Sequence, residues 1–143
     1  AGLRYEAKVF DLLAALLEWN DLTLSTPAAA SISAKDQEAM QSLKHFLLQN
    51  YSAKVDLQRL AQMCYMSKSK LTYLFRMLYG TTIYEFILAC RIDRAKELLA
   101  DREKKLSEIA VLVGYERQSS FSAAFHQKTG ITPNEFRRQF WNK

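Results

Sequence analysis

The sequence predicts an all-α protein in which one amphipathic helix and a linker precede two helix-turn-helix subdomains joined by a long central helix. Only four Gly and two Pro occur in the 143 residues, fewer than strands and tight turns need, whereas good helix formers such as Ala, Leu, Lys and Glu are abundant. Apolar residues make up 49% of the chain, which is enough to form a buried core. An internal repeat indicates that the same helical unit occurs twice.

The first predicted element is a helix over residues 3–20. Its apolar residues alternate at spacings of four and three, as in a heptad seam, and they are Leu3, Ala7, Phe10, Ala14 and Leu17. Such a seam serves equally well as a dimer contact or as a surface docked on another domain, and the sequence favours neither. Residues 25–34 are small and polar and contain Pro27, which indicates a linker.

A second domain is predicted over residues 35–143. Ser33 and Asp36 can cap its first helix, which is expected to run to about Asn50. One buried stripe on this helix is expected to comprise Met40, Leu43, Leu47 and Tyr51.

The repeat has two copies, at about residues 55–80 and 106–130. Residues 57–64 (LQRLAQMC) recur as residues 106–113 (LSEIAVLV). After a one-residue insertion, Leu71, Phe75, Gly80, Thr82, Glu85 and Phe86 recur as Phe121, Phe125, Gly130, Thr132, Glu135 and Phe136. Each copy therefore comprises a short helix, a tight connection and a second helix that a left-handed Gly can end. A capping box (Thr82 with Glu85, Thr132 with Glu135) then opens the next helix, in the second case with Pro133 at its first position.

Between the copies, a central helix is predicted from about Ile83 to Ala100. Its residues available for burial are Phe86, Ile87, Cys90, Ala95, Leu98 and Leu99. Roughly 18 residues span about 27 Å, close to the ~34 Å between successive major-groove faces of a duplex. A rigid helix of this length would let one chain read two adjacent major-groove segments, with the difference taken up by bending of protein or DNA.

In a helix-turn-helix unit, the second helix enters the major groove. In the first copy the core stripe is expected to be Leu71, Leu74, Phe75 and Leu78, which leaves Ser69, Thr72, Tyr73 and Arg76 on the opposite face. In the second copy Phe121, Ala124 and Phe125, with Lys128 as an optional fourth, take the stripe, and Gln118, Ser119, Ser122, Ala123 and His126 are expected to be exposed. Hydroxyls, amides, Arg and Ala can all contact base edges, so these faces are the candidates for reading bases.

The charge distribution favours a polyanionic partner. Residues 35–143 hold 18 Lys and Arg against 11 Asp and Glu, a balance of +7, whereas residues 1–34 carry −2. Phosphate attraction is the expected role of Lys68, Lys70, Arg117 and Lys128. The alternatives are that each polar stripe is only a solvated face, or that the repeat is a helical protein-interaction module. Tyr65 and Tyr115 are interpreted as core or turn-packing residues and not as readers.

Other functional classes receive no support from the sequence. There is no Gly-rich phosphate loop and no paired catalytic carboxylates, and His45 and His126 fall on separate helices, so no enzyme is predicted. Cys64 and Cys90 lack disulfide or zinc spacing and are expected to be buried, reduced packing residues. No apolar run approaches the roughly 18 residues of a membrane span. A soluble, cytoplasmic protein without metal, cofactor or membrane contact is expected.

Three segments carry a family resemblance: residues 91–99 (RIDRAKELL), 106–115 (LSEIAVLVGY) and 120–137 (SFSAAFHQKTGITPNEFR). They closely resemble the signature of the AraC/XylS family of bacterial transcription regulators, and the resemblance covers residues 35–143. It implies a seven-helix DNA-binding domain with recognition helices starting near Lys68 and Gln118. By position, the family's base-contacting sites fall on Ser69, Thr72, Tyr73, Gln118, Ser119, Ser122 and Ala123.

The resemblance also implies a transcription regulator at the bacterial nucleoid, with an operator DNA and RNA polymerase as partners. Whether it is an activator or a repressor stays open at this point. Residues 1–24 would be the last helix of an effector or dimerisation domain, with a homodimer through the seam from Leu3 to Leu17 as one outcome. Two residues depart from the family pattern: Tyr65, where Gly is common in the first turn, and Ala123, where a long polar side chain is common. The second copy is therefore expected to rely more on DNA shape or backbone contacts.

Overall fold

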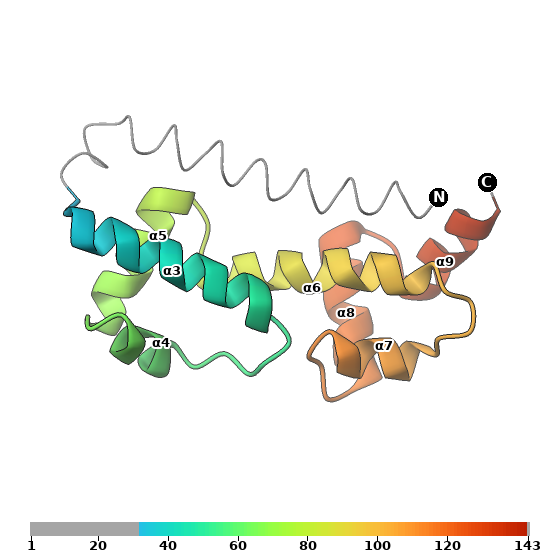
Figure 1. Cartoon of the computed structure of the whole chain (residues 1–143). Helices are drawn as coiled ribbons and strands as arrows, with labels where there is room; N and C mark the ends of the chain where they lie inside the picture. The colour runs from blue at the N-terminus through green and yellow to red at the C-terminus, as the bar shows by residue number, and fades with distance from the viewer. Residues whose placement is uncertain (1–31, 143) are drawn as a thin grey trace. The chain divides into compact units, whose positions relative to one another are not determined.

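The computed structural model describes residues 32–142, in which all regular structure is helical (Figure 1). The seven helices are α3 (Ala34–Asn50), α4 (Leu57–Met63), α5 (Lys68–Tyr79), α6 (Ile83–Leu99), α7 (Leu106–Leu112), α8 (Gln118–Thr129) and α9 (Pro133–Trp141). This confirms the all-α, seven-helix prediction. The helix expected over residues 3–20, and residues 25–31 of the expected linker, lie outside the described residues.

The described residues form two compact units, each containing one copy of the repeat. The N-terminal unit comprises residues 32–50 and 54–87, with α3, α4, α5 and the first five residues of α6. The C-terminal unit comprises residues 51–53 and 88–142, with the rest of α6 followed by α7, α8 and α9.

The start of α3 follows the predicted cap. The Ser33 Oγ accepts a hydrogen bond from the Asp36 amide at 3.1 Å, and the Ser33 carbonyl accepts from the Gln37 amide at 3.0 Å. The helix therefore begins at Ala34, one residue before the expected domain boundary. Its buried stripe is Met40, Leu43 and Leu47, as predicted. Tyr51 is not part of that stripe, because α3 ends at Asn50 and Tyr51 belongs to the C-terminal unit.

The helix-turn-helix of the N-terminal unit has a side-chain cap at the start of each helix. The Asp56 Oδ1 accepts from the amides of Gln58 (3.1 Å) and Arg59 (3.4 Å) at the start of α4. The Ser67 Oγ accepts from the Lys70 amide at 3.1 Å at the start of α5. Gly80 ends α5 with a φ of 67°, the left-handed conformation predicted for it.

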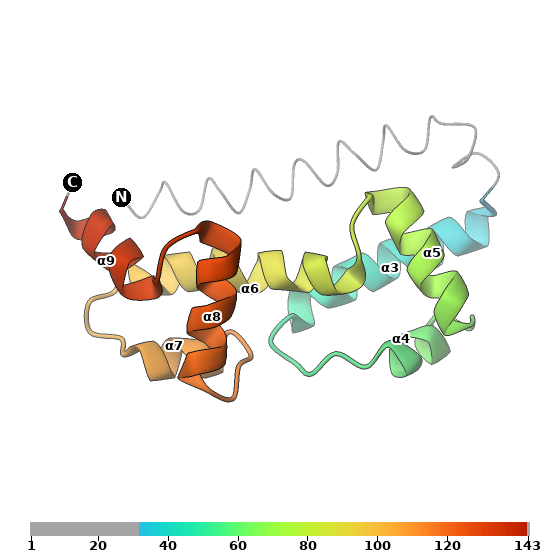
Figure 2. The same ribbon diagram turned by 180° about the vertical axis from the view of Figure 1, so that it is seen from behind.

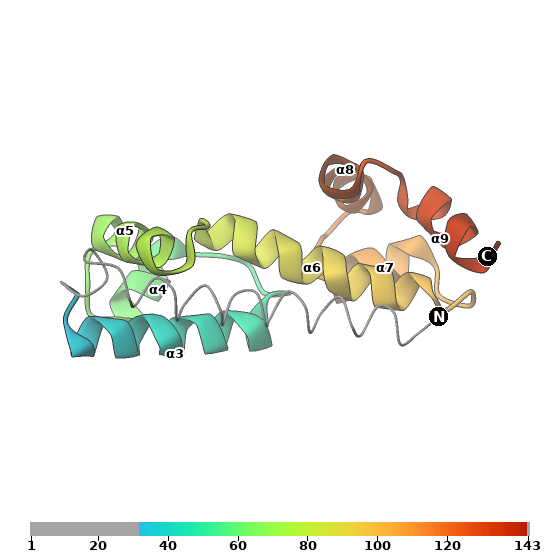
Figure 3. The ribbon, with the colours of Figure 1, turned by 90° about the horizontal axis from the view of Figure 1, so that it is seen from above.

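The core of the N-terminal unit lies where α3, α4, α5 and the start of α6 meet; Figure 3 shows α4 and α5 beside α3. Phe75 of α5 packs edge-to-face on Tyr79 (ring centroids 4.9 Å apart) and on Phe86 (5.7 Å). Buried aliphatic residues surround these rings, and they are Met40, Leu43, Leu47, Leu60, Leu71, Leu74, Leu78, Ile83 and Ile87.

The C-terminal unit has a core of its own, which lies between the second half of α6 and helices α7, α8 and α9 (Figure 2). Four aromatic rings pack in a row in this core. The ring centroids are 5.9 Å apart for Tyr115 and Phe121, 5.9 Å for Phe121 and Phe125, and 5.6 Å for Phe125 and Phe136. Gly130 ends α8 with a φ of 84°, and Thr132 with Glu135 forms the predicted capping box before Pro133.

Helix α6 is continuous through both units. It opens on the predicted capping box, in which the Glu85 amide donates to the Thr82 Oγ1 (3.1 Å) and the Thr82 amide to the Glu85 Oε2 (3.3 Å). It ends at Leu99, one residue short of the predicted end. The residues expected to be buried are buried: Phe86, Ile87, Cys90, Ala95, Leu98 and Leu99. Among the described helices, none has the length and hydropathy that a membrane span requires.

Candidate nucleic-acid interface

Helix α5 separates its side chains into a buried and an exposed face. The predicted core stripe of Leu71, Leu74, Phe75 and Leu78 is at most 5% exposed. The four residues expected on the opposite face, Ser69, Thr72, Tyr73 and Arg76, are all exposed, and Tyr73 is 62% exposed. An aromatic ring left so open on a well-packed helix is available to a partner.

Two residues of α5 have local partners that restrict what they can offer to a ligand. The Thr72 hydroxyl lies 3.1 Å from the Lys68 carbonyl and 3.0 Å from the Ser69 carbonyl. Its single proton is therefore used within the helix, and towards a ligand Thr72 presents an acceptor oxygen and a methyl group. Lys70 forms an ion pair with Asp36 of α3 at 3.1 Å. An exposed pair of this kind is worth under about 1 kcal/mol, so a phosphate can compete for the ammonium.

Helix α8 repeats the arrangement, with smaller exposed side chains. Gln118, Ser119, Ala123 and His126 are exposed as predicted, whereas Ser122 is half-buried. Phe121 and Phe125 form the buried stripe, with Ala124 half-buried beside them.

Lys128 takes no part in the α8 stripe, because its side chain is exposed, so its assignment as an optional fourth member was wrong. The physical reason is that Ile131 and Phe136, which follow the helix, cover this end of the core. Lys128 is exposed on α8, as is Arg117 at its N-cap, while α5 exposes Lys68, Lys70 and Arg76.

The start of α8 differs from that of α5. Its N-cap is Arg117, whose side chain makes no capping hydrogen bond, whereas Ser67 caps α5. The first turn of α8 therefore combines amides without a side-chain cap, the positive end of the helix dipole and a basic side chain.

The turns before the two recognition helices also differ. Tyr65 has a left-handed φ of 55° and is 91% exposed, so the expectation that it packs in the core or turn was wrong. Its backbone conformation directs the side chain away from the core of its own unit. The repeat places Gly114 at the equivalent position, with a φ of 106°. Tyr115 does pack in its turn, against Phe121 and beneath the Arg91 guanidinium, 5.0 Å from its ring centroid.

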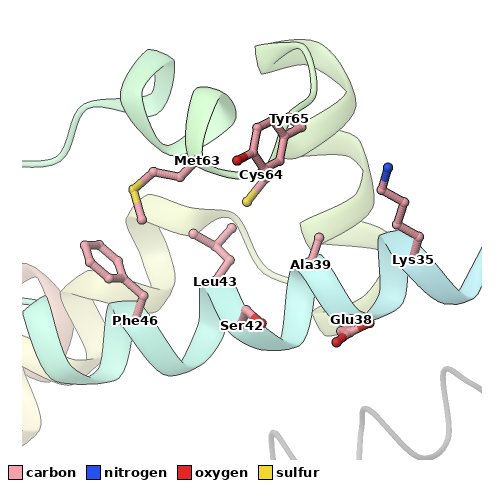
Figure 4. A pocket seen from close by; sticks show the side chains of 9 residues that line it. All are labelled: Lys35, Glu38, Ala39, Ser42, Leu43, Phe46, Met63, Cys64 and Tyr65. Atoms are coloured by element: carbon pink, nitrogen blue, oxygen red, sulfur yellow. The ribbon is translucent and has the colours of Figure 1, made fainter.

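A shallow groove of about 310 Å³ lies between α3 and the turn after α4 (Figure 4). Leu43 and Phe46 line it from α3, and Met63, Cys64 and Tyr65 face them. Cys64 is half-buried and not fully buried as expected, and burial raises the pKa of its thiol. A raised pKa keeps the thiol protonated, whereas the thiolate is the nucleophilic form of cysteine.

Cys90 is buried, as predicted. Burial, with a smaller contribution from Asp93, raises its pKa to about 12. Both cysteines are free thiols. Within residues 32–142, no three His, Cys, Asp or Glu side chains are grouped so as to hold a metal ion, and His45 and His126 lie on α3 and α8.

A model of the family described as "Helix-turn-helix domain" matches residues 60–139, more than half of the chain. The chain belongs to the AraC-type helix-turn-helix family. The resemblance found in the sequence is therefore confirmed, over a range that includes α5, α6, α7, α8 and most of α9.

Two relatives and one solved structure illustrate the family. The chain is 32% identical over 119 residues to the probable transcriptional regulator LumQ of Photobacterium leiognathi, covering 80% of this chain and 48% of LumQ. It is 31% identical over 103 residues to AdaA of Bacillus subtilis, a bifunctional transcriptional activator and DNA repair enzyme, covering 72% and 49%. The chain thus spans about half the length of these AraC-type relatives.

The fold is similar to that of a transcriptional regulator with an AraC-type DNA-binding domain from Chromobacterium violaceum. The TM-score is 0.64 at 25% sequence identity, and the match covers 76% of this chain and 96% of that one. The similarity therefore extends over about three quarters of this chain and nearly all of the other.

Proposed function

We propose that this chain binds double-stranded DNA sequence-specifically through α5 and α8, as the DNA-reading part of a bacterial transcription regulator. The observation that carries the proposal is that the same helix-turn-helix occurs twice, each time with a polar face exposed opposite a buried stripe. Membership of the AraC-type family and the surplus of basic residues support it.

In α5, the proposed base-reading residues are Ser69, Thr72 and Tyr73. Thr72 would accept a hydrogen bond from a base amino group or place its methyl against a thymine methyl, because its own proton is used within the helix. Arg76 would contact a guanine edge or a phosphate, and Lys68 and Lys70 would contact phosphates.

In α8, we propose fewer direct contacts to base edges than in α5. Gln118 suits an adenine edge, Ala123 a thymine methyl, and Ser119, Ser122 and His126 can contact bases or phosphates. Arg117, next to the amides of the first turn that have no side-chain cap, would contact a phosphate. Because Ser122 is half-buried and Ala123 is short, we propose that this unit relies more on DNA shape and backbone contacts.

We propose further that α5 and α8 enter adjacent major-groove segments of one duplex. Helix α6, which runs through both units, has 17 residues and therefore a length of about 25 Å. Bending of the DNA would close the difference to the ~34 Å of one helical turn, at a cost of a few kcal/mol.

The roles beyond DNA binding are also proposals. We propose that the chain activates transcription at the nucleoid by contacting RNA polymerase. In this view residues 1–24 end an effector or dimerisation domain, residues 25–34 link it to the described helices, and Leu3, Ala7, Phe10, Ala14 and Leu17 form a dimer seam. Since the relative AdaA is named as a repair enzyme as well as an activator, the family alone does not exclude catalysis. We propose that this part of the chain acts by binding.

Selection of bound fragments from genomic DNA by the purified chain tests the proposal. We expect a recurrent sequence with two segments about 10 base pairs apart, and an affinity that falls on the order of 10³-fold between about 50 and 200 mM salt. A double variant, Arg76→Ala with Arg117→Ala, should lower the slope of log affinity against log salt by about 2. Recovery of unrelated fragments, or binding insensitive to salt, would contradict the proposal and favour a protein-interaction module instead.

A further inference from the structure

The connection between α3 and α4 contains a segment that belongs to the other unit. Tyr51–Ala53 lies in the C-terminal unit, although the residues on both sides of it lie in the N-terminal unit. The chain therefore enters and leaves the C-terminal unit within three residues. We call Tyr51–Ala53 the tether.

Arg91 of α6 holds the two ends of the tether. Its Nε donates to the Tyr51 carbonyl at 2.7 Å, and its Nη2 donates to the Ala53 carbonyl at 3.1 Å. The guanidinium also lies over the Tyr115 ring, 5.0 Å from the centroid. A planar fork that donates twice and stacks once cannot be replaced by a lysine ammonium.

Gly114 gives the middle of the tether the space it occupies. A Cβ added at Gly114 would lie 2.6 Å from the Ser52 carbonyl oxygen and 2.9 Å from the Ser52 Cα. The backbone also favours glycine here, because Gly114 has a φ of 106°, whereas Tyr65 at the equivalent position of the other copy carries a side chain at a φ of 55°. The space left by Gly114 is therefore filled by the tether.

We propose that Arg91 and Gly114 are positioning residues that hold the tether on the C-terminal unit and thereby set the spacing at which α5 and α8 engage DNA. This rests on the proposed function. With the tether held, the units are connected at two places, through the tether and through α6. Within residues 32–142, release of the tether leaves α6 as the one restrained connection, which lowers the effective concentration of the second DNA-reading helix at its site.

The test compares the selected DNA with the same DNA lengthened by one base pair between its two segments. The insertion moves the second segment by about 3.4 Å and rotates it by about 34°. The parent chain should bind the lengthened DNA at least about tenfold more weakly, whereas Arg91→Ala and Gly114→Ala should bind both within about threefold.

Two matched controls separate positioning from general damage. Arg137 also donates to backbone carbonyls distant in sequence, those of Leu99 (3.2 Å) and Lys104 (2.7 Å), but these belong to the continuous segment 88–142 and not to a segment flanked on both sides by the N-terminal unit. Gly130 also has a positive φ, yet a Cβ there would meet no atom within 4 Å. Arg137→Ala and Gly130→Ala should therefore keep the spacing preference of the parent chain. The same loss of preference in the controls, or a full preference in the tether variants, would overturn the proposal.

A measurement without DNA distinguishes failure of the tether from failure of the proposed function. Spin labels on Gln62→Cys and Glu108→Cys, both exposed positions, in a Cys64→Ser background report the distance between α4 and α7. The distance distribution should be wider in Arg91→Ala than in the parent, and equally narrow in Arg137→Ala. Equal widths in Arg91→Ala and the parent would overturn the proposed role of the tether, whatever DNA the chain binds. If Arg91→Ala shows the wider distribution but the parent binds no DNA, only the DNA-binding role is overturned.

Discussion

At the scale of single residues, Tyr79 presents the largest mismatch between a side chain and its surroundings. The residue is fully buried at the end of α5, and its hydroxyl has no hydrogen-bond partner among residues 32–142. The Lys44 Nζ lies over its ring, 4.9 Å from the centroid, and interacts with the π face and not with the oxygen. The ring contributes to the core, while the hydroxyl costs desolvation energy.

Tyr79→Phe is therefore expected to stabilise the protein by about 1 kcal/mol, because it removes an unsatisfied polar atom and keeps the ring. Urea unfolding followed by circular dichroism measures the change, with the exposed Tyr84→Phe as a control that should leave stability unchanged. A Tyr79→Phe variant less stable than the parent would mean that the hydroxyl has a partner.

The same burial predicts alkaline sensitivity. Burial raises the pKa of Tyr79 from 10.0 to about 12, and burial followed by Asp93 raises the pKa of Cys90 from 9.0 to about 12. Both groups hold their protons more tightly in the folded state, so stability is fully present below about pH 9 and falls as the pH rises towards 12. Unfolding titrations between pH 9 and 12 should show this decline, and Tyr79→Phe should make it shallower above pH 10. An identical slope in the variant would contradict the assignment.

At the scale of elements, the two copies of the repeat place similar helices but start their recognition helices differently. Ser67 caps α5 with its side chain, whereas Arg117 makes no such bond at α8. The repeat in sequence predicts both helices and both Gly residues that end them. Both caps stand four residues before the aligned Leu71 and Phe121, but this position is Ser in one copy and Arg in the other.

The two caps should respond differently to truncation. Ser67→Ala should destabilise the protein by about 1 kcal/mol because the Lys70 amide loses its acceptor. Arg117→Ala should change stability by less than about 0.5 kcal/mol, since an exposed residue without a capping bond is removed. Thermal unfolding of the two variants measures both changes in stability, and an equal loss of stability in both would contradict the assigned caps.

Within α5, neighbouring residues should separate base reading from backbone contact. Tyr73→Ala should relax discrimination at one or two base pairs by about 1–3 kcal/mol, because a base-edge contact is specific to its base. Arg76→Ala should weaken binding on the selected DNA and lower the salt slope by about 1 if its guanidinium contacts a phosphate. Affinities for a set of single-base-pair variants of the selected DNA provide the measurement. A uniform loss on all of them would assign Tyr73 to the DNA backbone.

At the scale of the whole molecule, each half of the described chain has its own core, and the cores are centred on equivalent rings. Phe75 is buried in the N-terminal unit, and Phe125, its counterpart in the repeat, is buried in the C-terminal unit. A core of this size supports a small domain of marginal stability, so we expect the units to open separately.

Phe75→Ala should cost about 3–5 kcal/mol in its own unit and raise amide exchange in α4 and α5, while α7 and α8 remain protected. Phe125→Ala should produce the reverse pattern. Hydrogen–deuterium exchange with peptide-level detection follows both. Loss of protection in all helices for either variant would show instead that the chain unfolds as one cooperative domain.

Much of the described fold follows from local pattern. Apolar periodicity predicts which residues of α5 and α6 are buried, and Gly80, Gly130 and the two capping boxes mark where helices end and begin. The exposed face of α5 follows for the same reason, since the side of a helix opposite its core stripe has nowhere else to point. Lys128 and Tyr51 were assigned wrongly, because residues beyond the helix ends decide what covers a core.

Contacts between distant segments are what the sequence alone does not determine. The ion pair of Lys70 with Asp36 joins residues 34 positions apart, and the hydrogen bond from Arg91 to Tyr51 joins residues 40 positions apart. No helical periodicity relates residues so distant in sequence. Tyr65 and Gly114 are a second example. The repeat aligns these two residues, but the φ of 106° at Gly114 and the tether packed against it both disfavour a side chain, and neither can be predicted from the repeat. Periodicity determines the helices and their faces because hydrogen bonding along a helix is local, whereas the neighbours of each face are chosen by three-dimensional packing.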